Sequence, residues 1–448
     1  MRITSLVTML LLAAPVLADD WPQYLGLQRD ATWRETGIPE KFPAGGPKVL
    51  WRQPIGPGYT GPAVAGDRVY VMDRPSATGG KIKDAFAKAA LPGNERVLCL
   101  DAATGKENWK HEYDCPYQKL SYPSGPRATP LIHGGKVYTL GAMGHLFCFD
   151  EKSGKILWEK QIAKEYKTDH PIWGYAAHPF IDGQKLILLV GGDGSAVVAF
   201  DKDTGKEIWK ALDTQEVCYA PPIITEAGGK RQLIVWLSEA LYSLDPETGK
   251  QYWLVGYPED GKPQRPAVNI AIPLRIDDLL FVSSFYHGAL AVKLAKDKPA
   301  AEVAYRTQMK KGDDPEEAPG LHALMTTPIA RDGYIYGVGA TGELKCLKAS
   351  TGKPMWMTRK PLDDKKADCG TLFFVVNGDR YFLFTDLGEL IIAKLTPKGY
   401  EEIDRAKVIE PSQSARGRNV VWSHPAFAHK CAFIRSDKEI ICVALAKE

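Results

Sequence analysis

The sequence predicts an all-β protein: an eight-bladed β-propeller of four-stranded antiparallel blades, whose last blade is closed by an N-terminal strand. Three observations lead to this fold class. A turn of the form Asp-x-x-Thr-Gly-Lys recurs about every 49 residues, a tryptophan follows its copies, and the 448 residues include 42 glycines, 32 prolines and 19 tyrosines. Repeats of this length, rich in turns and β-forming residues, are typical of propeller blades.

The first 18 residues predict an export signal. Arg2 provides a short positive region, residues 3–15 are mostly apolar, and Val16-Leu-Ala18 forms a small-residue cleavage site before Asp19. The apolar run is shorter than the ~20 residues of a membrane-spanning helix, and no cysteine follows it that could accept a lipid. We therefore expect a periplasmic or secreted protein, soluble after signal cleavage and without a membrane span.

The charge balance excludes some classes of partner. Lys and Arg total 57 against 54 Asp and Glu, which gives a net charge of +3. A chain so close to neutrality is not expected to bind nucleic acid or acidic lipid as its main role. Hydrophobic residues make up 44% of the chain, which supports a large core. We expect a monomer.

The repeated turn sets the length of one blade. Its copies are Asp101-Ala-Ala-Thr-Gly105, Asp150-Glu-Lys-Ser-Gly154, Asp201-Lys-Asp-Thr-Gly205, Asp245-Pro-Glu-Thr-Gly249, Lys348-Ala-Ser-Thr-Gly352 and a degenerate Thr396-Pro-Lys-Gly399. Their glycines are 49, 51, 44, 103 and 47 residues apart, and the longest interval counts as two blades. Aspartates cap turns of this kind. A calcium loop is not expected at Asp201, because Leu212 stands where an EF-hand needs a glutamate.

Each repeat contains four expected strands. The first is a short apolar run, the second follows a Gly or Asp turn, the third precedes the repeated turn, and the fourth carries Trp109, Trp158, Trp209, Trp253 or Trp356. First strands are expected near Gly61, Thr129, His178, Pro221, Ile272, Thr327, Thr371 and His424. The count is therefore eight blades.

The eighth repeat ends at Glu448, before its fourth strand. Lys48-Val-Leu-Trp51 matches the fourth strand Lys155-Ile-Leu-Trp158, so we expect the N-terminal part of the chain to complete the last blade. Such closure removes an exposed sheet edge. The predicted organisation is a signal peptide over residues 1–18, an N-terminal segment over 19–47 and the propeller over 48–448.

Small residues share one position of the third strand. They are Cys99, Cys148, Ala199, Ser243, Ala291, Cys346, Ala393 and Cys442. We interpret this as a tight packing position, because equivalent positions on different blades are too far apart for a disulfide. Cys115, Cys218, Cys369 and Cys431 have no evident partner, although an exported protein could pair two of them.

Two repeats carry a family resemblance. Leu98-Cys-Leu-Asp-Ala-Ala-Thr-Gly-Lys-Glu-Asn-Trp109 and Val198-Ala-Phe-Asp-Lys-Asp-Thr-Gly-Lys-Glu-Ile-Trp209 resemble the tryptophan-docking repeat of the PQQ-like β-propeller family, and Trp21-Pro-Gln-Tyr-Leu-Gly26 resembles the opening of its exported members. The resemblance implies the propeller fold but two different functions. Quinoprotein dehydrogenases of the family hold PQQ and calcium at the blade axis, whereas its outer-membrane assembly lipoprotein binds other proteins. The chain has neither the adjacent cysteine pair frequent in the dehydrogenases nor a lipid-accepting cysteine after its signal.

A ligand site is expected where the first strands begin, around the ring axis. The entrances bring together Tyr59, Arg127, Tyr175, His178, Tyr219, Trp422 and His424. Aromatic rings with Arg and His could stack on and charge-pair with a planar anion such as a quinone carboxylate. The other interpretation, which the residue types alone favour, is that these side chains only pack and hydrogen-bond around a water-filled channel. A metal site among His178, His424 and His287 is not expected, because paired His-x-x-x-His or Cys-x-x-Cys spacing is missing.

Two functions remain open from the sequence. The favoured one is an exported, non-catalytic scaffold that binds a protein partner or another envelope ligand on the face of the ring formed by the loops between blades. It has no catalytic residue and no cofactor. No nucleophile elbow, phosphate loop or dinucleotide fingerprint is present in the sequence. The alternative is a quinoprotein oxidoreductase that depends on PQQ and a divalent cation such as calcium.

Overall fold

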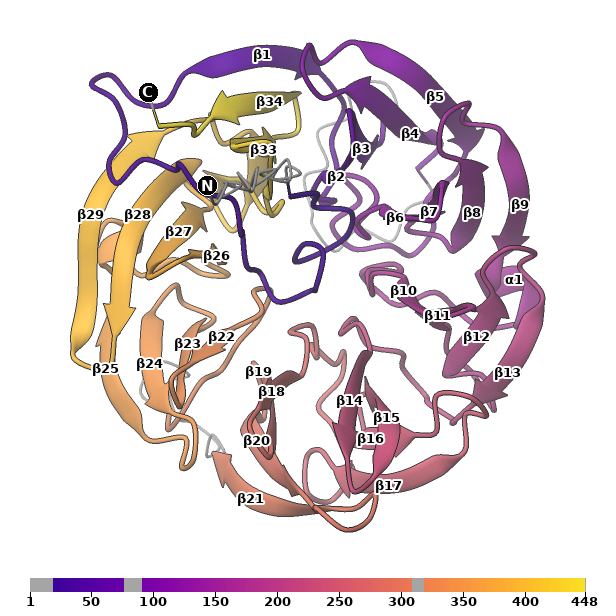
Figure 1. Ribbon diagram of the computed structural model, residues 1–448. Helices are drawn as coiled ribbons and strands as arrows, with labels where there is room; N and C mark the ends of the chain where they lie inside the picture. Colours follow the sequence, from indigo (N-terminus) through magenta and orange to yellow (C-terminus); the bar gives the residue numbers. More distant parts are fainter. Residues whose placement is uncertain (1–18, 76–90, 308–317, 448) are drawn as a thin grey trace, which may run out of the picture.

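Eight blades surround a central axis and follow one another around the ring in chain order (Figure 1). The computed structural model describes residues 19–75, 91–307 and 318–447. Within these residues, eight sheets have four antiparallel strands each, and one further sheet is a two-stranded hairpin. The predicted all-β fold class and the predicted number of blades are therefore confirmed.

The strands of the first four blades follow the predicted repeats. They are β2 (Ala63–Ala65), β3 (Arg68–Asp73), β4 (Asn94–Asp101) and β5 (Glu107–Asp114) in blade 1; β6 (Leu131–His133), β7 (Lys136–Leu140), β8 (His145–Asp150) and β9 (Ile156–Gln161) in blade 2; β10 (Phe180–Asp182), β11 (Lys185–Leu189), β12 (Val197–Asp201) and β13 (Glu207–Ala211) in blade 3; β14 (Ile223–Ala227), β15 (Lys230–Trp236), β16 (Ala240–Leu244) and β17 (Gln251–Gly256) in blade 4.

The second half of the ring has the same order. Its strands are β18 (Leu274–Ile276), β19 (Leu279–Ser284), β20 (Gly288–Leu294) and β21 (Ala301–Thr307) in blade 5; β22 (Ile329–Arg331), β23 (Tyr334–Val338), β24 (Leu344–Lys348) and β25 (Pro354–Thr358) in blade 6; β26 (Leu372–Asn377), β27 (Arg380–Thr385), β28 (Glu389–Thr396) and β29 (Gly399–Lys407) in blade 7; β32 (Ala426–Ala428), β33 (Cys431–Arg435) and β34 (Glu439–Ala444) in blade 8. The connections add a helix α1 (Ile162–Glu165), a 3₁₀ turn η1 (Lys360–Leu362) and a hairpin of β30 (Gln413–Ala415) and β31 (Arg418–Val420).

Strand β1 (Val49–Pro54) closes the ring, as predicted. It pairs antiparallel with β34, so the outermost strand of blade 8 comes from the opposite end of the chain (Figure 1). Trp51 lies opposite Cys442, and Pro54 lies opposite Glu439. Trp51 thereby takes the place that Trp109 and its equivalents hold in other blades.

Tryptophans on the outer strands join neighbouring blades. The indole N–H of Trp109 donates to the carbonyl of Glu151 in blade 2 at 3.1 Å, and its ring lies against Gly154. The same pair of contacts recurs from Trp51 to blade 1, from Trp158 to blade 3 and from Trp209 to blade 4. Tyr305 substitutes for tryptophan in blade 5, where its hydroxyl donates to the carbonyl of Ala349 at 2.8 Å. The repeated turn is therefore the surface onto which the preceding blade docks.

Small third-strand residues leave room for these large rings. Cys99 lies opposite Trp109, Cys148 opposite Trp158 and Ala199 opposite Trp209. All eight members of this position are at most 1% exposed. All eight cysteines of the chain carry free thiols.

The two faces of the ring differ. We call the side with the repeated turns the turn face, and the side with the loops between blades the loop face. Residues 19–47, which precede β1, cross the turn face over the axis (Figure 1). Trp21 forms a backbone bridge with Val64 in blade 1, and Thr32 forms one with Val376 in blade 7. The sequence predicted residues 19–47 only as an N-terminal segment before the propeller, whereas in the structure its Trp21, Trp33 and Ile38 belong to a buried core cluster.

Two further observations bear on the sequence predictions. No helix within the described residues is long and apolar enough to cross a membrane. The predicted signal peptide lies outside the described residues.

Candidate functional site

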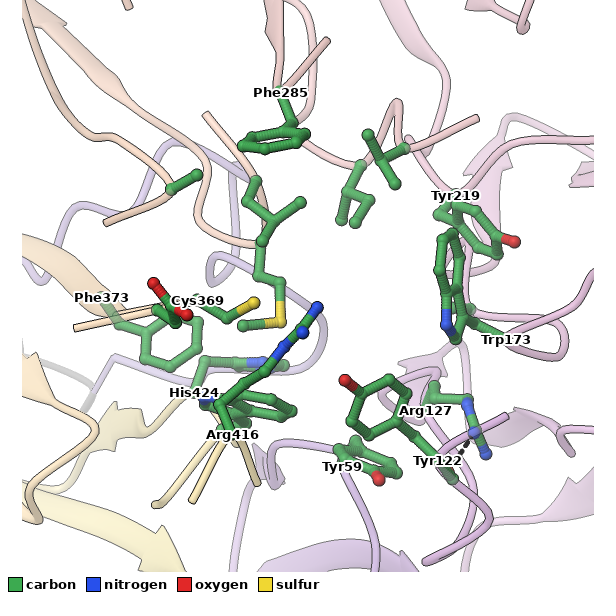
Figure 2. A pocket seen from close by; sticks show the side chains of 18 of the residues that line it. Tyr59, Tyr122, Arg127, Trp173, Tyr219, Phe285, Cys369, Phe373, Arg416 and His424 are labelled. Carbon is green, nitrogen blue, oxygen red and sulfur yellow. Dashed lines mark hydrogen bonds between the residues drawn. The ribbon is translucent and has the colours of Figure 1, made fainter. Parts of the chain in front are cut away.

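A cavity of about 870 Å³ lies on the axis and opens to the loop face. Aromatic rings are prominent in its lining, with side chains converging from nearly every blade (Figure 2). The lining residues are Tyr24, Tyr59, Tyr122, Arg127, Trp173, Ala176, His178, Tyr219, Pro221, Pro266, Val268, Ile270, Phe285, Tyr286, Leu324, Met325, Ala340, Thr341, Lys366, Asp368, Cys369, Phe373, Arg416, Trp422 and His424. Its size is within the range of pockets for small ligands.

The structure brings together six of the seven residues expected at the strand entrances. They are Tyr59, Arg127, His178, Tyr219, Trp422 and His424, and all line the cavity. Tyr175 lies elsewhere. Its ring packs into the core between blades 2 and 3, it is 2% exposed, and its hydroxyl donates to the carbonyl of Val190 at 3.1 Å. Gly174, which precedes it, has a left-handed backbone with φ of 70°.

Tyr24 forms the floor of the cavity. It arrives from the turn face, and its ring stacks on His178 with centroids 4.0 Å apart and meets the edge of His424 at 4.6 Å. Its hydroxyl is 3.2 Å from the hydroxyl of Thr327 in blade 6. Sequence reasoning missed Tyr24, because it lies in the non-repeating segment. The motif Trp21-Pro-Gln-Tyr was recognised only as a family feature.

The two histidines of the floor are neutral. The backbone N–H of Thr129 donates to Nδ1 of His178 at 2.8 Å, and the Thr129 hydroxyl is 2.9 Å from Nε2 of His424. Burial lowers the pKa of His424 to about 3 and holds the pKa of His178 well below its usual value. Burial therefore disfavours the charged form of both rings near neutral pH, so positive charge for an anion would come from the arginines of the cavity.

The third histidine considered for a metal site lies apart from these two. His287, the third candidate, accepts a hydrogen bond from the backbone N–H of Gln264 and is not among the cavity residues. In the described part of the chain, no three His, Cys, Asp or Glu side chains come together as ligands for a metal ion.

Arg127 brings a positive charge to the wall of the cavity. Its guanidinium donates to the carbonyls of Ser121, Tyr122 and Gly125, the first at 2.9 Å, and it lies over the Tyr59 ring at 4.9 Å from the centroid. Carbonyl oxygens satisfy these donors without neutralising the charge. Burial raises the pKa of Tyr59 to about 12, so this phenol stays protonated.

Arg416 brings a second positive charge, at the mouth. It occupies the turn between β30 and β31, and it hydrogen-bonds to Cys369 and Tyr122. These three residues come from different loops, yet all have left-handed backbones, with φ of 49° at Arg416, 55° at Cys369 and 52° at Tyr122. Strained backbone of this kind concentrates at functional sites.

A buried ion pair holds the hairpin that carries Arg416. Arg418 on β31 contacts the fully buried carboxylate of Asp386 at 2.6 Å. Asp386 also accepts from the backbone N–H of Thr371 at 3.1 Å. The hairpin is thereby fixed to blade 7, and the Arg416 side chain projects over the cavity (Figure 2).

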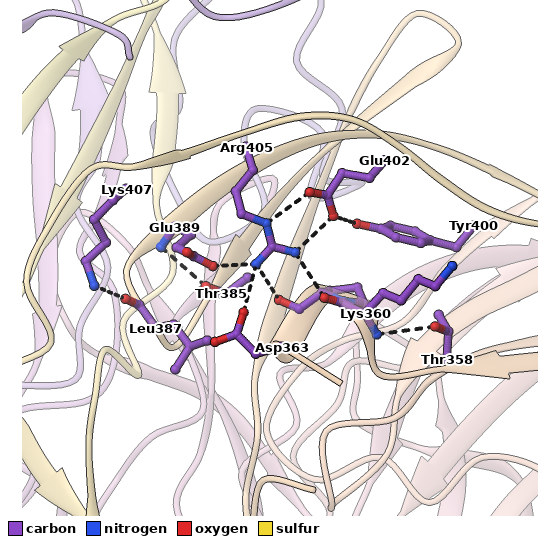
Figure 3. A network of polar contacts seen from close by, with 11 residues as sticks. Thr358, Lys360, Asp363, Thr385, Leu387, Glu389, Tyr400, Glu402, Arg405 and Lys407 are labelled. Carbon is purple, nitrogen blue, oxygen red and sulfur yellow. Dashed lines mark hydrogen bonds and ion pairs between the residues drawn. The ribbon is translucent and has the colours of Figure 1, made fainter. Parts of the chain in front are cut away.

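A polar network on the outside of blade 7 fixes the loop that carries Cys369. Arg405 on β29 contacts Glu389 at 2.7 Å, Glu402 at 2.9 Å and Asp363 at 3.5 Å, and donates to the carbonyl of Lys360 at 3.0 Å (Figure 3). Hydrogen bonding to Glu402 raises the pKa of Arg405. We interpret this network as structural, because its residues do not line the cavity.

The blades, their tryptophan docking and the axial cavity define an eight-bladed β-propeller with room for a ligand. A family model described as outer membrane protein assembly factor BamB matches residues 93–358. The chain belongs to this family of PQQ-like propellers, which confirms the resemblance seen in the repeats.

Similar proteins fall into two groups. The chain is 20% identical to the outer membrane protein assembly factor BamB of Shewanella oneidensis over 254 residues, 56% of this chain and 61% of that protein. It is 26% identical to the quinoprotein ethanol dehydrogenase of Pseudomonas putida over 214 residues, 43% of this chain and 32% of that enzyme. The match therefore spans less than two thirds of either relative.

Solved structures show the same fold. BamB from Moraxella catarrhalis has a TM-score of 0.55 at 13% identity, covering 88% of this chain and 99% of that one. Quinohemoprotein alcohol dehydrogenase from Comamonas testosteroni has a TM-score of 0.62 at 12% identity, covering 96% of this chain and 81% of that one. At these identities the likeness concerns the fold alone.

Proposed function

We propose that this protein is an exported, non-catalytic scaffold that binds a partner protein or another envelope ligand at its loop face. The observation that carries the proposal is the axial cavity, whose walls are aromatic and whose polar groups are mostly cations and neutral rings. Rigid rings commonly use variable loops for binding. The relatives named as outer membrane assembly factors support a role of this kind.

An envelope location and a monomeric state belong to the same proposal. The predicted export signal supports the location, although residues 1–18 lie outside the described residues. Closure of the ring within one chain supports the monomer, because β1 completes blade 8 without a second copy.

A second candidate is a PQQ-dependent oxidoreductase, which the dehydrogenase relatives favour. Aromatic walls with Arg127 and Arg416 would suit a planar anion, and such a cofactor would supply the redox chemistry. Calcium fits less well. It takes six to eight oxygen ligands, whereas Asp368 is the one carboxylate among the residues that line the cavity.

Titration with PQQ and Ca²⁺ separates the two functions. Absorbance and calorimetry are measured on the mature protein, with the cavity variant Trp422→Ala as the comparison. The scaffold proposal expects no saturable heat and no spectral shift. Saturable micromolar binding that Trp422→Ala weakens would overturn the scaffold and favour the oxidoreductase.

A further inference from the structure

The cavity is blind, because the chain's own N-terminal segment closes it from the turn face. The Tyr24 ring occupies the axis between His178 and His424. Arg29 helps to hold the segment, since its guanidinium donates to the carbonyl of Pro222 at 2.9 Å and lies 4.4 Å from the centroid of Phe180. An occupant therefore enters and leaves by the loop face, and a polypeptide cannot be threaded through the ring.

The charge of the cavity favours an acidic occupant. Among the residues that the structure describes, three cationic side chains line it, Arg127, Lys366 and Arg416, against one carboxylate, Asp368. Charges in a concave site of low dielectric act more strongly than charges on an open surface. The remaining lining is largely aromatic and apolar.

Arg416 is the cation best placed to meet an incoming anion. Arg127 is 9% exposed and directs its donors to backbone carbonyls, whereas Arg416 is exposed at the mouth. The side chains to which Arg416 hydrogen-bonds, Cys369 and Tyr122, are uncharged, since burial raises the pKa of both, and Asp368 is the carboxylate that interacts with Arg416 electrostatically. An acidic group at the mouth would thus gain a charge-assisted hydrogen bond.

Aromatic rings below Arg416 offer an apolar contact surface. Trp173 and Tyr219 pair with centroids 5.6 Å apart, and Tyr122 and Trp422 pair at 5.8 Å. Aromatic partners add stabilisation beyond burial when rings meet at such distances. An occupant with an aromatic side chain next to an acidic group would satisfy both parts of the site.

We infer that the cavity receives an acidic, aromatic loop tip or chain end of a partner protein, with Arg416 as the anchor for its carboxylate. The inference rests on the proposed scaffold function and names the chemistry of the partner. A blind, ligand-sized cavity fits the end of a peptide, and its excess of cations fits an acidic one.

Fluorescence anisotropy with two labelled peptides tests the inference. One peptide is Glu-Phe-Asp-Phe with a free carboxylate, and the other is Lys-Phe-Lys-Phe amide, both labelled at the N-terminus. We expect the acidic peptide to bind at least tenfold more tightly, and its affinity to fall as salt rises. Arg416→Gln should weaken it at least fivefold, whereas Arg416→Lys should retain most of the affinity.

The matched control is Arg52→Gln. Arg52 lies on β1 with its side chain 50% exposed and pairs with Glu439, so its loss should change neither folding nor peptide affinity. Equal binding of the two peptides, or an unchanged affinity in Arg416→Gln with an unchanged melting curve, would overturn the inference.

The outcome also separates this inference from the scaffold proposal. Absence of peptide binding together with absence of PQQ binding refutes the acidic occupant and leaves the scaffold role standing. Absence of peptide binding with saturable PQQ binding refutes both.

Discussion

The Trp109 ring of blade 1 lies so close to Gly154 of blade 2 that a Cβ on this glycine would stand 2.5 Å from the indole. Gly154 also has φ of +70°, which L side chains rarely adopt. The glycine of the repeated turn therefore has two roles: it forms the turn, and it makes room for the ring of the preceding blade.

Gly154→Ala should destabilise the protein by about 3 kcal/mol, because left-handed backbone strain and overpacking add. Gly183→Ala is the matched control, since Gly183 has φ of +60° but open space around its Cβ direction. We expect about 1 kcal/mol for the control. Urea denaturation of both variants measures the difference, and equal losses would contradict the docking role of Gly154.

Trp109→Ala should cost about 3–5 kcal/mol, as for a large ring removed from a core. Trp422→Ala should cost about 1 kcal/mol, because Trp422 is only half-buried at the cavity wall. Trp422→Ala should weaken the binding of a ligand in the cavity more than Trp109→Ala does. A larger loss of stability at Trp422 than at Trp109 would show that packing and binding positions are reversed.

Two truncations should distinguish the role of β1 from the role of the segment that precedes it. Removing residues 19–52 takes away most of β1 and exposes the edge of β34, so we expect loss of cooperative unfolding and aggregation. Removing only residues 19–34 takes away Tyr24 and the buried Trp21 and Trp33 but leaves β1, and should give a ring with an open axis that still unfolds cooperatively, at a lower temperature. Calorimetry on both proteins checks this. If the protein without residues 19–52 unfolds cooperatively at the melting temperature of the full-length protein, the ring closes in another way.

The free energy of unfolding should decrease as the pH falls, because the buried histidines at the floor of the cavity bind protons more readily in the unfolded state. His424 has a folded pKa of about 3 and an unfolded value near 6.5, so the unfolded state binds more protons between these values. The folded state therefore loses stability as pH falls below about 6.5, by about 2 kcal/mol between pH 7 and pH 5 from His424 alone. His424→Gln should be less stable at pH 7 but have a shallower slope. An unchanged slope in denaturation at pH 7, 6 and 5 would contradict the neutral buried histidine.

Most of the ring could be predicted from its period. The repeated turn predicted the length of a blade, the count of first strands predicted eight blades, and the match of Lys48-Val-Leu-Trp51 to a fourth strand predicted the pairing of β1 with β34. These features depend on local patterns that recur, so each copy supports the others. Blade 5 departs from the pattern, because Tyr305 replaces its tryptophan and Ala295–Ala300 replaces its Thr-Gly turn.

The candidate site was harder to predict, because it depends on contacts between distant segments. Tyr24 reaches its place through stacking on His178 and a hydroxyl contact with Thr327, neither of which leaves a pattern near Tyr24. Tyr175 resembled the cavity residues in the sequence, but the direction of its ring is set by the local backbone and core. A residue's position at the start of a first strand predicts that it lies near the axis, but it does not predict whether its side chain faces the cavity.

Site-specific photo-crosslinking in cells that export the protein tests the central claim most directly, namely that the partner binds at the loop-face cavity. A benzophenone amino acid replaces either Phe285, which lines the cavity, or Leu27, which is 51% exposed in the segment on the turn face. Our account predicts an adduct from position 285, with mass spectrometry locating the crosslink in an acidic, aromatic peptide of an envelope protein. Adducts from position 27 with none from position 285 would contradict it.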